Sequence, residues 1–325
     1  MKKFLIKILI ILTIIAAIVL IVNEIYIRNV SWHTDDIYAY ESMPSELQIC
    51  NFGSSHGVYG YNYENYEEKY NCFNFGLVSQ SLSYDYRLFQ NYENHIGKGA
   101  VVFITISYFS LFGKDETLED DFESKNKRYY SILPPSLIKK YDFTTDLYTY
   151  KLPILGIDPE VMWGKMVRSV LRIEEPQEVV DEDIVSTENV DLHEDAKKAC
   201  GRHVDNAGKH DENGNFIVNQ EEVQALYDLI HMCKNKGAIP ILIITPYLRE
   251  YTDEVKKVDG FYEQFYELLS EIAEKESVEY YDYAFDERFN ARYEWFMNSD
   301  HLNETGAKEF VDILMKEIVF KKGYL

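Results

Sequence analysis

The stretch Asn51-Phe52-Gly53-Ser54-Ser55-His56-Gly57 decides how the rest of the chain is interpreted. It follows residues 46–50, which have the pattern of a short strand, and a polar segment that could open a helix comes after it. A serine on a tight turn between a strand and a helix is well presented as a nucleophile, because flanking glycines permit the turn and leave room for an acyl group. The same letters also suit a Gly/Ser turn that caps a helix, so this segment alone leaves both interpretations open.

Gly53, Ser55 and Gly57 match the spacing of the nucleophile elbow of the α/β-hydrolases. In that fold the elbow lies in the middle of the sheet, well into the domain. Here it ends the first strand that follows an apolar N-terminal segment. The position therefore argues against an α/β-hydrolase fold.

Charge and length limit the classes of function. The chain has 325 residues, enough for one large core or two modest ones, and its 55 acidic residues against 33 basic ones give a net charge of −22. Such a chain repels polyanions, which argues against a nucleic-acid partner. A strongly anionic polymer would be a substrate only where local basic residues or cations offset the repulsion.

Residues 4–22 are apolar apart from Lys7, and about 20 residues of helix cross the hydrocarbon core of a membrane. Lys2, Lys3 and Lys7 lie at the N-terminal side and Glu24 follows, so the positive-inside rule places the N-terminus in the cytoplasm. No small-residue cleavage site follows the apolar run, which argues against a cleaved signal peptide. The sequence predicts a single-pass type II protein of the cell membrane, with its C-terminal domain outside the cytoplasm.

Strand-like and helix-like segments alternate along most of the chain, which predicts an α/β fold: a three-layer α/β/α sandwich with a central parallel sheet, flavodoxin-like in type. Residues 1–28 are predicted to be a cytoplasmic stub and transmembrane helix, 29–45 a stalk, and 46–325 the α/β domain. The pattern degrades over 107–216, which predicts an inserted region of helices and loops after the third strand, with helices at 134–141 and 161–173. The other predicted strands and helices are 46–52, 71–76, 100–106, 239–245 and 278–282 (strands), and 81–95, 220–236, 258–275 and 304–320 (helices).

A second polar stretch precedes the last predicted helix: Asn298-Ser299-Asp300-His301-Leu302-Asn303. A serine hydroxyl needs a base of near-neutral pKa to take its proton, and that base needs a partner that holds its tautomer and stabilises the imidazolium. This loop offers both, with His301 as the base and an acidic residue beside it. Asn303 is placed to cap the helix that follows.

Together these blocks resemble the SGNH hydrolases, in the family's order and over most of residues 46–320. There the first strand ends in a Gly-x-Ser block, the second in an Asn-x-Gly block, and the chain closes on Asp-x-x-His; here they are Gly53-Ser54-Ser55, Asn74-Phe75-Gly76 and the His301 loop. The resemblance implies that Ser55 is the nucleophile and His301 the base. It also implies that the backbone amides of Ser55 and Gly76 line an oxyanion hole.

Two positions depart from the family's pattern. Asn298 stands where the family usually has aspartate, so either Asn298 orients His301 through its amide oxygen, or Asp300 substitutes, or the site is weakened. The asparagine of the third block is missing, and a hydroxyl of Ser107 or Tyr108 is the candidate replacement as oxyanion donor.

Other polar residues are candidates for substrate contacts or metal ligands. Residues beside the catalytic blocks or at the end of the fourth strand are candidate substrate contacts: Ser54, His56, Asn74, Thr245 and Tyr247. No metal site and no cofactor is predicted. The spacing of four possible ligands follows no known pattern, namely His193, Cys200, His203 and His210, and a calcium-like loop over 209–220 lacks its terminal carboxylates.

The sequence therefore predicts a membrane-anchored extracytoplasmic serine esterase or O-acyltransferase. Glycine-serine-serine in the first block together with the N-terminal anchor resembles the D-alanyl-lipoteichoic acid biosynthesis and polysaccharide O-acetylation branches. This resemblance implies acyl groups of a cell-surface glycan or teichoic acid as substrate, with a membrane acyl-donor protein as a further partner. The alternative is a non-catalytic binding or assembly protein for cell-envelope polymers, which the two departures favour.

Overall fold

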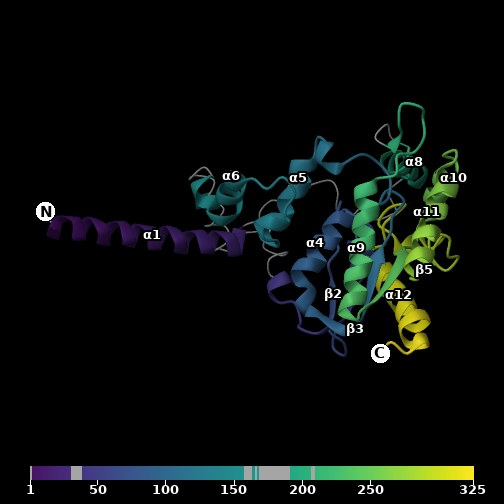
Figure 1. The fold of residues 1–325 in the computed structure, drawn as a ribbon, viewed down its shortest axis with the longest axis horizontal. Helices are drawn as coiled ribbons and strands as arrows, with labels where there is room; N and C mark the ends of the chain where they lie inside the picture. Colours follow the sequence, from purple (N-terminus) through teal and green to yellow (C-terminus); the bar gives the residue numbers. More distant parts are fainter. Residues whose placement is uncertain (1, 31–38, 157–162, 165–166, 168–190, 206–208) are drawn as a thin grey trace. The chain divides into compact units, whose positions relative to one another are not determined.

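The central sheet consists, in the described residues, of five parallel strands in the order β2-β1-β3-β4-β5 (Figure 1). They are β1 (Leu47–Phe52), β2 (Cys72–Asn74), β3 (Ile96–Thr105), β4 (Ile239–Ile244) and β5 (Glu279–Asp282). Asn51 of β1 is in register with Asn74 on one side and Phe103 on the other. The strand order reverses between β1 and β3, and open parallel sheets bind ligands at the carboxyl ends of the strands beside such a reversal.

The computed structural model describes residues 2–30, 39–156, 163–164, 167, 191–205 and 209–325. The predicted helix over 161–173 lies outside these residues except at three positions. The chain divides into two compact units. The first unit is Met1–Ser42 with Asn126–Asp183, and the second unit is Met43–Lys125 with Ile184–Leu325.

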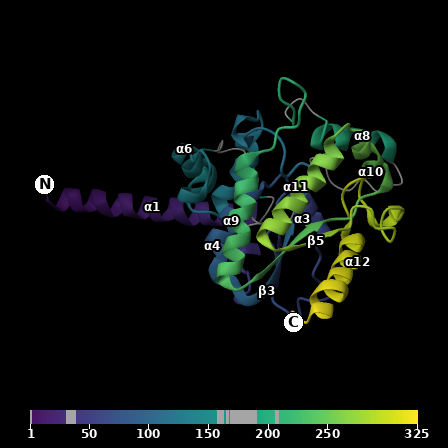
Figure 2. The ribbon, with the colours of Figure 1, turned by 45° about the vertical axis from the view of Figure 1, so that its right-hand side comes forward.

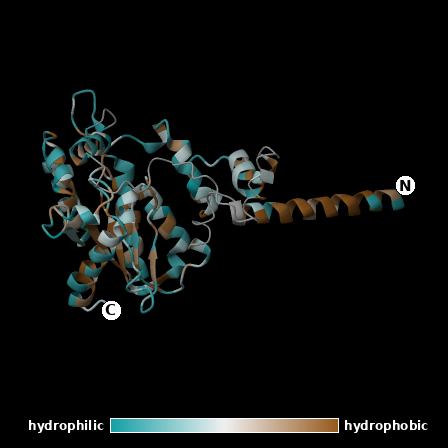
Figure 3. Ribbon diagram, turned by 180° about the vertical axis from the view of Figure 1, so that it is seen from behind, coloured by the Kyte–Doolittle hydropathy of each residue, from teal (hydrophilic) through white to brown (hydrophobic). Residues whose placement is uncertain are grey.

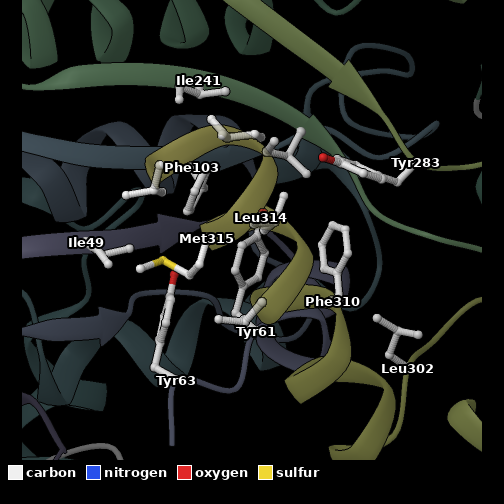
Figure 4. Close-up of a cluster of buried hydrophobic side chains, with 14 of the residues drawn as sticks. Ile49, Tyr61, Tyr63, Phe103, Ile241, Tyr283, Leu302, Phe310, Leu314 and Met315 are labelled. Carbon is white, nitrogen blue, oxygen red and sulfur yellow. The ribbon is translucent and has the colours of Figure 1, made fainter. Parts of the chain in front are cut away.

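Helices cover both faces of the sheet, so the predicted three-layer α/β/α sandwich is confirmed (Figures 1 and 2). On one face lie α4 (Leu82–Tyr92), α9 (Gln220–Lys236) and α11 (Phe261–Glu276). On the other, α12 (Glu304–Leu314) and the π-helical η10 (Met315–Phe320) pack on alternate strand residues such as Ile49, Phe103 and Ile241 (Figure 4). Nearly every residue of β3 and β4 is buried, because a parallel sheet covered on both sides has no solvent face.

Several boundaries differ from the sequence prediction. The first strand begins at Leu47, because Glu46 has a positive φ of 54°, and the third begins earlier than predicted, at Ile96. The predicted helix over 81–95 ends at Tyr92 and continues only as the 3₁₀ turn η1 (Glu93–His95). The predicted helix over 134–141 is a single 3₁₀ turn, η4 (Pro135–Leu137), since Pro134 and Pro135 limit the backbone.

Two helices of the second unit were not predicted, α8 (Leu192–His203) and α10 (Arg249–Lys256), whereas α3 (Ser55–Gly60) is a short helix at the serine turn, where the sequence indicated that one could begin. The side chain of Asp191 caps α8 by accepting from the backbone N–H groups of His193 and Glu194. Its buried face consists of small residues, including Ala196, Ala199 and Cys200. Small residues give only a weak hydrophobic periodicity, so no helix was predicted in this acidic segment.

In the first unit the long helix α1 (Lys2–Val30) is brown along most of its length in Figure 3. Within its segment Lys2–Ile27 an 18-residue window has a mean hydropathy of 3.3, which by length and composition is sufficient to cross a membrane. The Asn23 side chain is buried and donates a hydrogen bond to the Lys151 carbonyl (2.6 Å). Besides η4, the short helical turns described between β3 and α8 are η2 (Glu116–Leu118) and α5 (Phe122–Asn126), which lie wholly or mostly in the second unit, and η3 (Lys127–Ser131), α6 (Phe143–Thr145), η5 (Asp146–Lys151) and η6 (Pro153–Leu155) in the first.

Candidate active site

Ser55 is the first residue of α3 and follows the carboxyl end of β1 directly. The turn before it depends on Gly53, whose φ is +141° and where an added Cβ would lie 2.7 Å from the Cβ of Thr105. As the first helical residue, Ser55 has no carbonyl four positions earlier within α3 to accept its N–H. The turn thus presents both the hydroxyl and the amide of Ser55 at the ligand-binding edge of the sheet.

His301 lies on the loop before α12, and its Nε2 is 2.8 Å from Ser55 Oγ although 246 residues separate the two in the sequence. Asn303 begins α12 as predicted, because its side chain accepts a hydrogen bond from the Gly306 N–H (3.0 Å). The His301 side chain keeps 13% of its surface exposed. Its ring is therefore within reach both of the serine hydroxyl and of a substrate.

Asn298 holds His301 through one oxygen. Its Oδ1 accepts hydrogen bonds from the backbone N–H of His301 (2.8 Å) and of Asp300 (3.2 Å), and it lies 3.1 Å from His301 Nδ1. An amide oxygen only accepts, so this contact places the proton on Nδ1. Nε2 is then free to accept the proton of Ser55.

Asp300 approaches the same ring nitrogen: its Oδ1 is 3.3 Å from His301 Nδ1. Burial by itself would raise the pKa of this fully buried carboxyl, but His301, His56 and His203 around it lower the pKa well below its usual value. Asp300 is therefore a carboxylate. The structure brings both candidate partners close to His301. Asn298 supplies an oriented amide and Asp300 a negative charge.

Behind Asp300 lies a buried polar network. His56 Nε2 is 3.2 Å from Asp300 Oδ2, and His56 Nδ1 is 2.7 Å from the hydroxyl of Ser107 and 3.4 Å from that of Tyr247. The Ser107 hydroxyl in turn lies 3.3 Å from that of Ser54. Burial lowers the pKa of His56, so the neutral ring donates from Nε2 to Asp300 and accepts at Nδ1.

Four of the predicted site residues belong to this buried network. His56, Ser54 and Tyr247 were predicted as substrate contacts, and Ser107 as an oxyanion donor. All four are 3% exposed or less and bond to one another or to Asp300. Their side chains lie among protein groups, and His56 is the one of the four that contacts Asp300.

His203, which was not predicted to belong to the site, lies in the same buried network around Asp300. Its Nδ1 lies 2.9 Å from the Tyr251 hydroxyl and 3.6 Å from Asp300 Oδ2, and its ring packs against Phe109. Burial lowers the pKa of His203 to about 3, so its ring is neutral. The signal that could have found it is the Asp191 cap, which starts the helix α8 that carries it.

Donor atoms of His56, Asp300 and His301 lie within 4.8 Å of one another, a spacing that a metal ion would also accept. The contacts given above account for each of these atoms as part of a carboxylate–imidazole arrangement. Of the other possible ligands considered in the sequence, His193 is exposed on α8, and His210 packs against Phe216.

Asn74 and Gly76 join the end of β2 to α3. The Asn74 Nδ2 lies 3.1–3.2 Å from the carbonyl oxygens of Gly57, Val58 and Tyr61, and its Oδ1 accepts from the Gly76 N–H (2.9 Å). The Gly76 amide, predicted as an oxyanion donor, is thus paired with Asn74 in this structure. Among the positions predicted for that role, the Ser55 amide is the one that its place in the helix leaves available.

The remaining predicted contacts at the fourth strand are also interior. Thr245 is 2% exposed, and its methyl group would meet a Cβ at Gly60 at 3.0 Å. The Tyr108 alternative to Ser107 points elsewhere, because its ring packs on Phe265 and its hydroxyl lies 3.3 Å from that of Tyr266. Fewer of the predicted site residues therefore have side chains exposed beside Ser55 and His301.

No protein-family model matches the chain, and no curated protein matches it in sequence. Two solved structures similar in outline are a Bacteroides fragilis protein described as a "putative acylhydrolase" and a Streptococcus pneumoniae protein described as a "putative platelet activating factor". The first is 10% identical with a TM-score of 0.42 and covers 90% of this chain and 98% of its own. The second is 12% identical with a TM-score of 0.40 and covers 95% of this chain and 98% of its own. Likeness at this level assigns neither a family nor an activity.

Proposed function

We propose that this chain is a serine esterase or O-acyltransferase of the SGNH type. The single observation that supports it is the 2.8 Å separation of Ser55 Oγ and His301 Nε2, at the edge of the sheet where parallel α/β folds bind ligands. A hydroxyl and a base at this distance satisfy the geometric requirement for nucleophilic catalysis. The order of the three sequence blocks along the five strands agrees with that assignment.

The proposed reaction begins with attack of Ser55 Oγ on the carbonyl carbon of an ester, while His301 Nε2 takes the hydroxyl proton. The charge of Asp300 and the oxygen of Asn298 stabilise the imidazolium at Nδ1. The oxyanion forms near the Ser55 N–H, and its collapse releases the alcohol, which receives the proton from His301. Water or a sugar hydroxyl then attacks the acyl-serine, with His301 as base again, and Ser55 is restored.

The proposed location and substrate of the enzyme rest on the sequence and on α1. Glycine-serine-serine in place of the commoner first block, together with an apolar N-terminal helix, supports an enzyme held at the outer face of the cell membrane. Its substrate would be the acyl groups of a surface polysaccharide or teichoic acid, and a transferase would receive its acyl group from a membrane donor protein. A type II topology puts the second unit on the same side as these polymers.

One observation favours the alternative, a protein that binds such polymers without turnover. The Gly76 amide is paired with Asn74, and Ser107 with His56, so two of the three predicted oxyanion donors are engaged. Loss of one donor typically costs about a hundredfold to a thousandfold in rate. A weak hydrolase, a transferase or a binding protein all fit such a site better than a fast esterase.

Covalent labelling with a fluorophosphonate probe tests the proposal, since only an activated serine reacts with it. The full chain is expected to be labelled, and Ser55→Ala and His301→Ala to lose the label. Ser54→Ala is the matched control, because that neighbouring hydroxyl is buried against Ser107 and is expected to leave labelling intact. An unlabelled wild-type protein that retains binding to an acylated surface polymer would replace the proposal by its alternative.

A further inference from the structure

A set of apolar side chains in the first unit faces solvent close to the end of α1. Phe143, Tyr148 and Leu155 are 63%, 46% and 55% exposed, which is unusual for large apolar groups on neighbouring turns. They belong to α6, η5 and η6, three consecutive short helical segments of residues 143–155. Nothing in the proposed reaction uses them.

The inner side of the same segment is anchored, so the outward direction of these side chains is fixed. Asp146 is buried and accepts from Tyr141 (2.5 Å) and from Lys151, and the Tyr150 ring stacks on Tyr130 at 5.2 Å. Asp146 and Tyr150 are buried, whereas Phe143 and Tyr148 of the same segment are exposed. The exposed side chains thus belong to a folded segment that is anchored by its buried residues.

Helix geometry gives the depth at which these exposed side chains would lie relative to a membrane that α1 crosses. Residues 4–22 span about 28 Å at 1.5 Å per residue, close to the roughly 30 Å of a hydrocarbon core. Asn23, the first polar residue after this run, is buried and donates to the Lys151 carbonyl, and η6 packs against α1. If α1 spans a membrane, the segment that contacts Asn23 lies at the boundary between hydrocarbon and headgroups.

We infer that Phe143, Tyr148 and Leu155 form a lipid-contacting face that rests in the outer interface of the membrane crossed by α1. Aromatic side chains concentrate at this depth, and a Phe and a Leu on a short turn can enter the acyl region while the backbone remains among the headgroups. The net charge of −22 opposes attraction to anionic headgroups, so apolar insertion has to drive the contact. The face would fix the first unit against the bilayer, in addition to the tether that α1 supplies.

The test places a single tryptophan at the face in the full chain. Trp32, Trp163 and Trp295 are changed to Phe, Phe143→Trp is added, and the protein is reconstituted in vesicles of zwitterionic phosphatidylcholine. Lipids brominated near the headgroup end of the chain are expected to quench most of its emission, and lipids brominated near the methyl end much less. Ile14→Trp in the same background, in the middle of the apolar run, is the control and is expected to show the reverse order.

Each other result contradicts the inference. Quenching of Phe143→Trp by aqueous iodide and not by lipid would place the face in water. Blue-shifted emission that neither quencher reaches would show that a second copy or another protein covers it. Absence of lipid quenching at Ile14→Trp would remove the membrane span on which the inference rests. Fluorophosphonate labelling of the same variants reports separately on Ser55, so failure of the proposed chemistry is distinguishable from failure of the lipid contact.

Discussion

Asp300 lies between two rings: its Oδ2 is 3.2 Å from His56 Nε2, while its Oδ1 is 3.3 Å from His301 Nδ1. His301 in turn contacts Ser55, so the buried carboxylate connects the base to the interior of the protein. Asn298 shares the same ring nitrogen. The site therefore separates two tasks that one aspartate usually performs, namely orientation of the histidine and stabilisation of its charge.

Asp300→Asn is expected to lower kcat by about tenfold to a hundredfold, because a hydrogen bond to a charged group is worth about 1.5–3 kcal/mol. The Asn298 contact should keep the ring in place, so KM should change little. Steady-state kinetics with an ester substrate measures kcat and KM, and an unchanged kcat would show that Asp300 does not act on His301.

His56→Ala is expected to reduce kcat and also the free energy of unfolding, since it removes the donor to Asp300 and leaves polar groups unpaired at about 1–3 kcal/mol. Urea unfolding and ester turnover of the same preparation measure the two. His193→Ala, an exposed histidine on α8, is the matched control and should change neither. Full activity in His56→Ala would mean that Asp300 needs no support from this ring.

Gly76→Ala is expected to destabilise the fold by about 1–3 kcal/mol, because the new Cβ would lie 2.7 Å from backbone atoms of Gly57 and Val58. The displacement of α3 should also separate Ser55 from His301 and reduce labelling. Gly201→Ala provides the comparison, since it lies in α8 with nothing within 4 Å and should be neutral or stabilising by up to about 1 kcal/mol. Equal unfolding curves for the two variants would contradict the close packing at Gly76.

The contribution of Asp85 to the stability of the fold should decrease as pH rises. Burial raises the pKa of this carboxyl to about 8, despite the hydrogen bond that Gln80 donates to it (2.5 Å). In the unfolded chain its pKa is about 3.9. The protonated form is favoured by folding, so the contribution of Asp85 is fully present below about pH 4 and is lost at about 1.4 kcal/mol per unit up to about pH 8.

Chemical unfolding at a series of pH values measures this slope, and Asp85→Asn is expected to reduce it within that window. The Asn amide keeps the shape of the carboxylic acid and does not ionise. A wild-type slope that Asp85→Asn leaves unchanged would assign the dependence to other groups.

The elements and site residues that could be predicted are those that a local sequence pattern indicates. Apolar runs such as 100–106 and 239–245 located β3 and β4, and the glycine turn and the loop before α12 identified Ser55 and His301 before any distance was known. Asp300 was named because it adjoins His301 in sequence, and Asn298 because the SGNH resemblance places an aspartate at its position.

What the sequence did not reveal depends on contacts between distant segments. Whether Ser107 faces the substrate or His56 is decided by how the loop after β3 packs on α3, and no local pattern records that. His203 was missed because α8 hides its buried side behind small residues in an acidic segment. The pairing of the Gly76 amide with Asn74 likewise depends on how the end of β2 packs on α3.

If Ser55 forms an acyl-enzyme with the help of His301, that intermediate can be trapped. The full chain is mixed with p-nitrophenyl acetate, quenched in acid and digested, and the peptides are analysed by mass spectrometry. An acetyl group is expected on Ser55, absent in His301→Ala and retained in Ser54→Ala. An unmodified Ser55 in the wild-type protein, or acetylation that persists in His301→Ala, would contradict this mechanism.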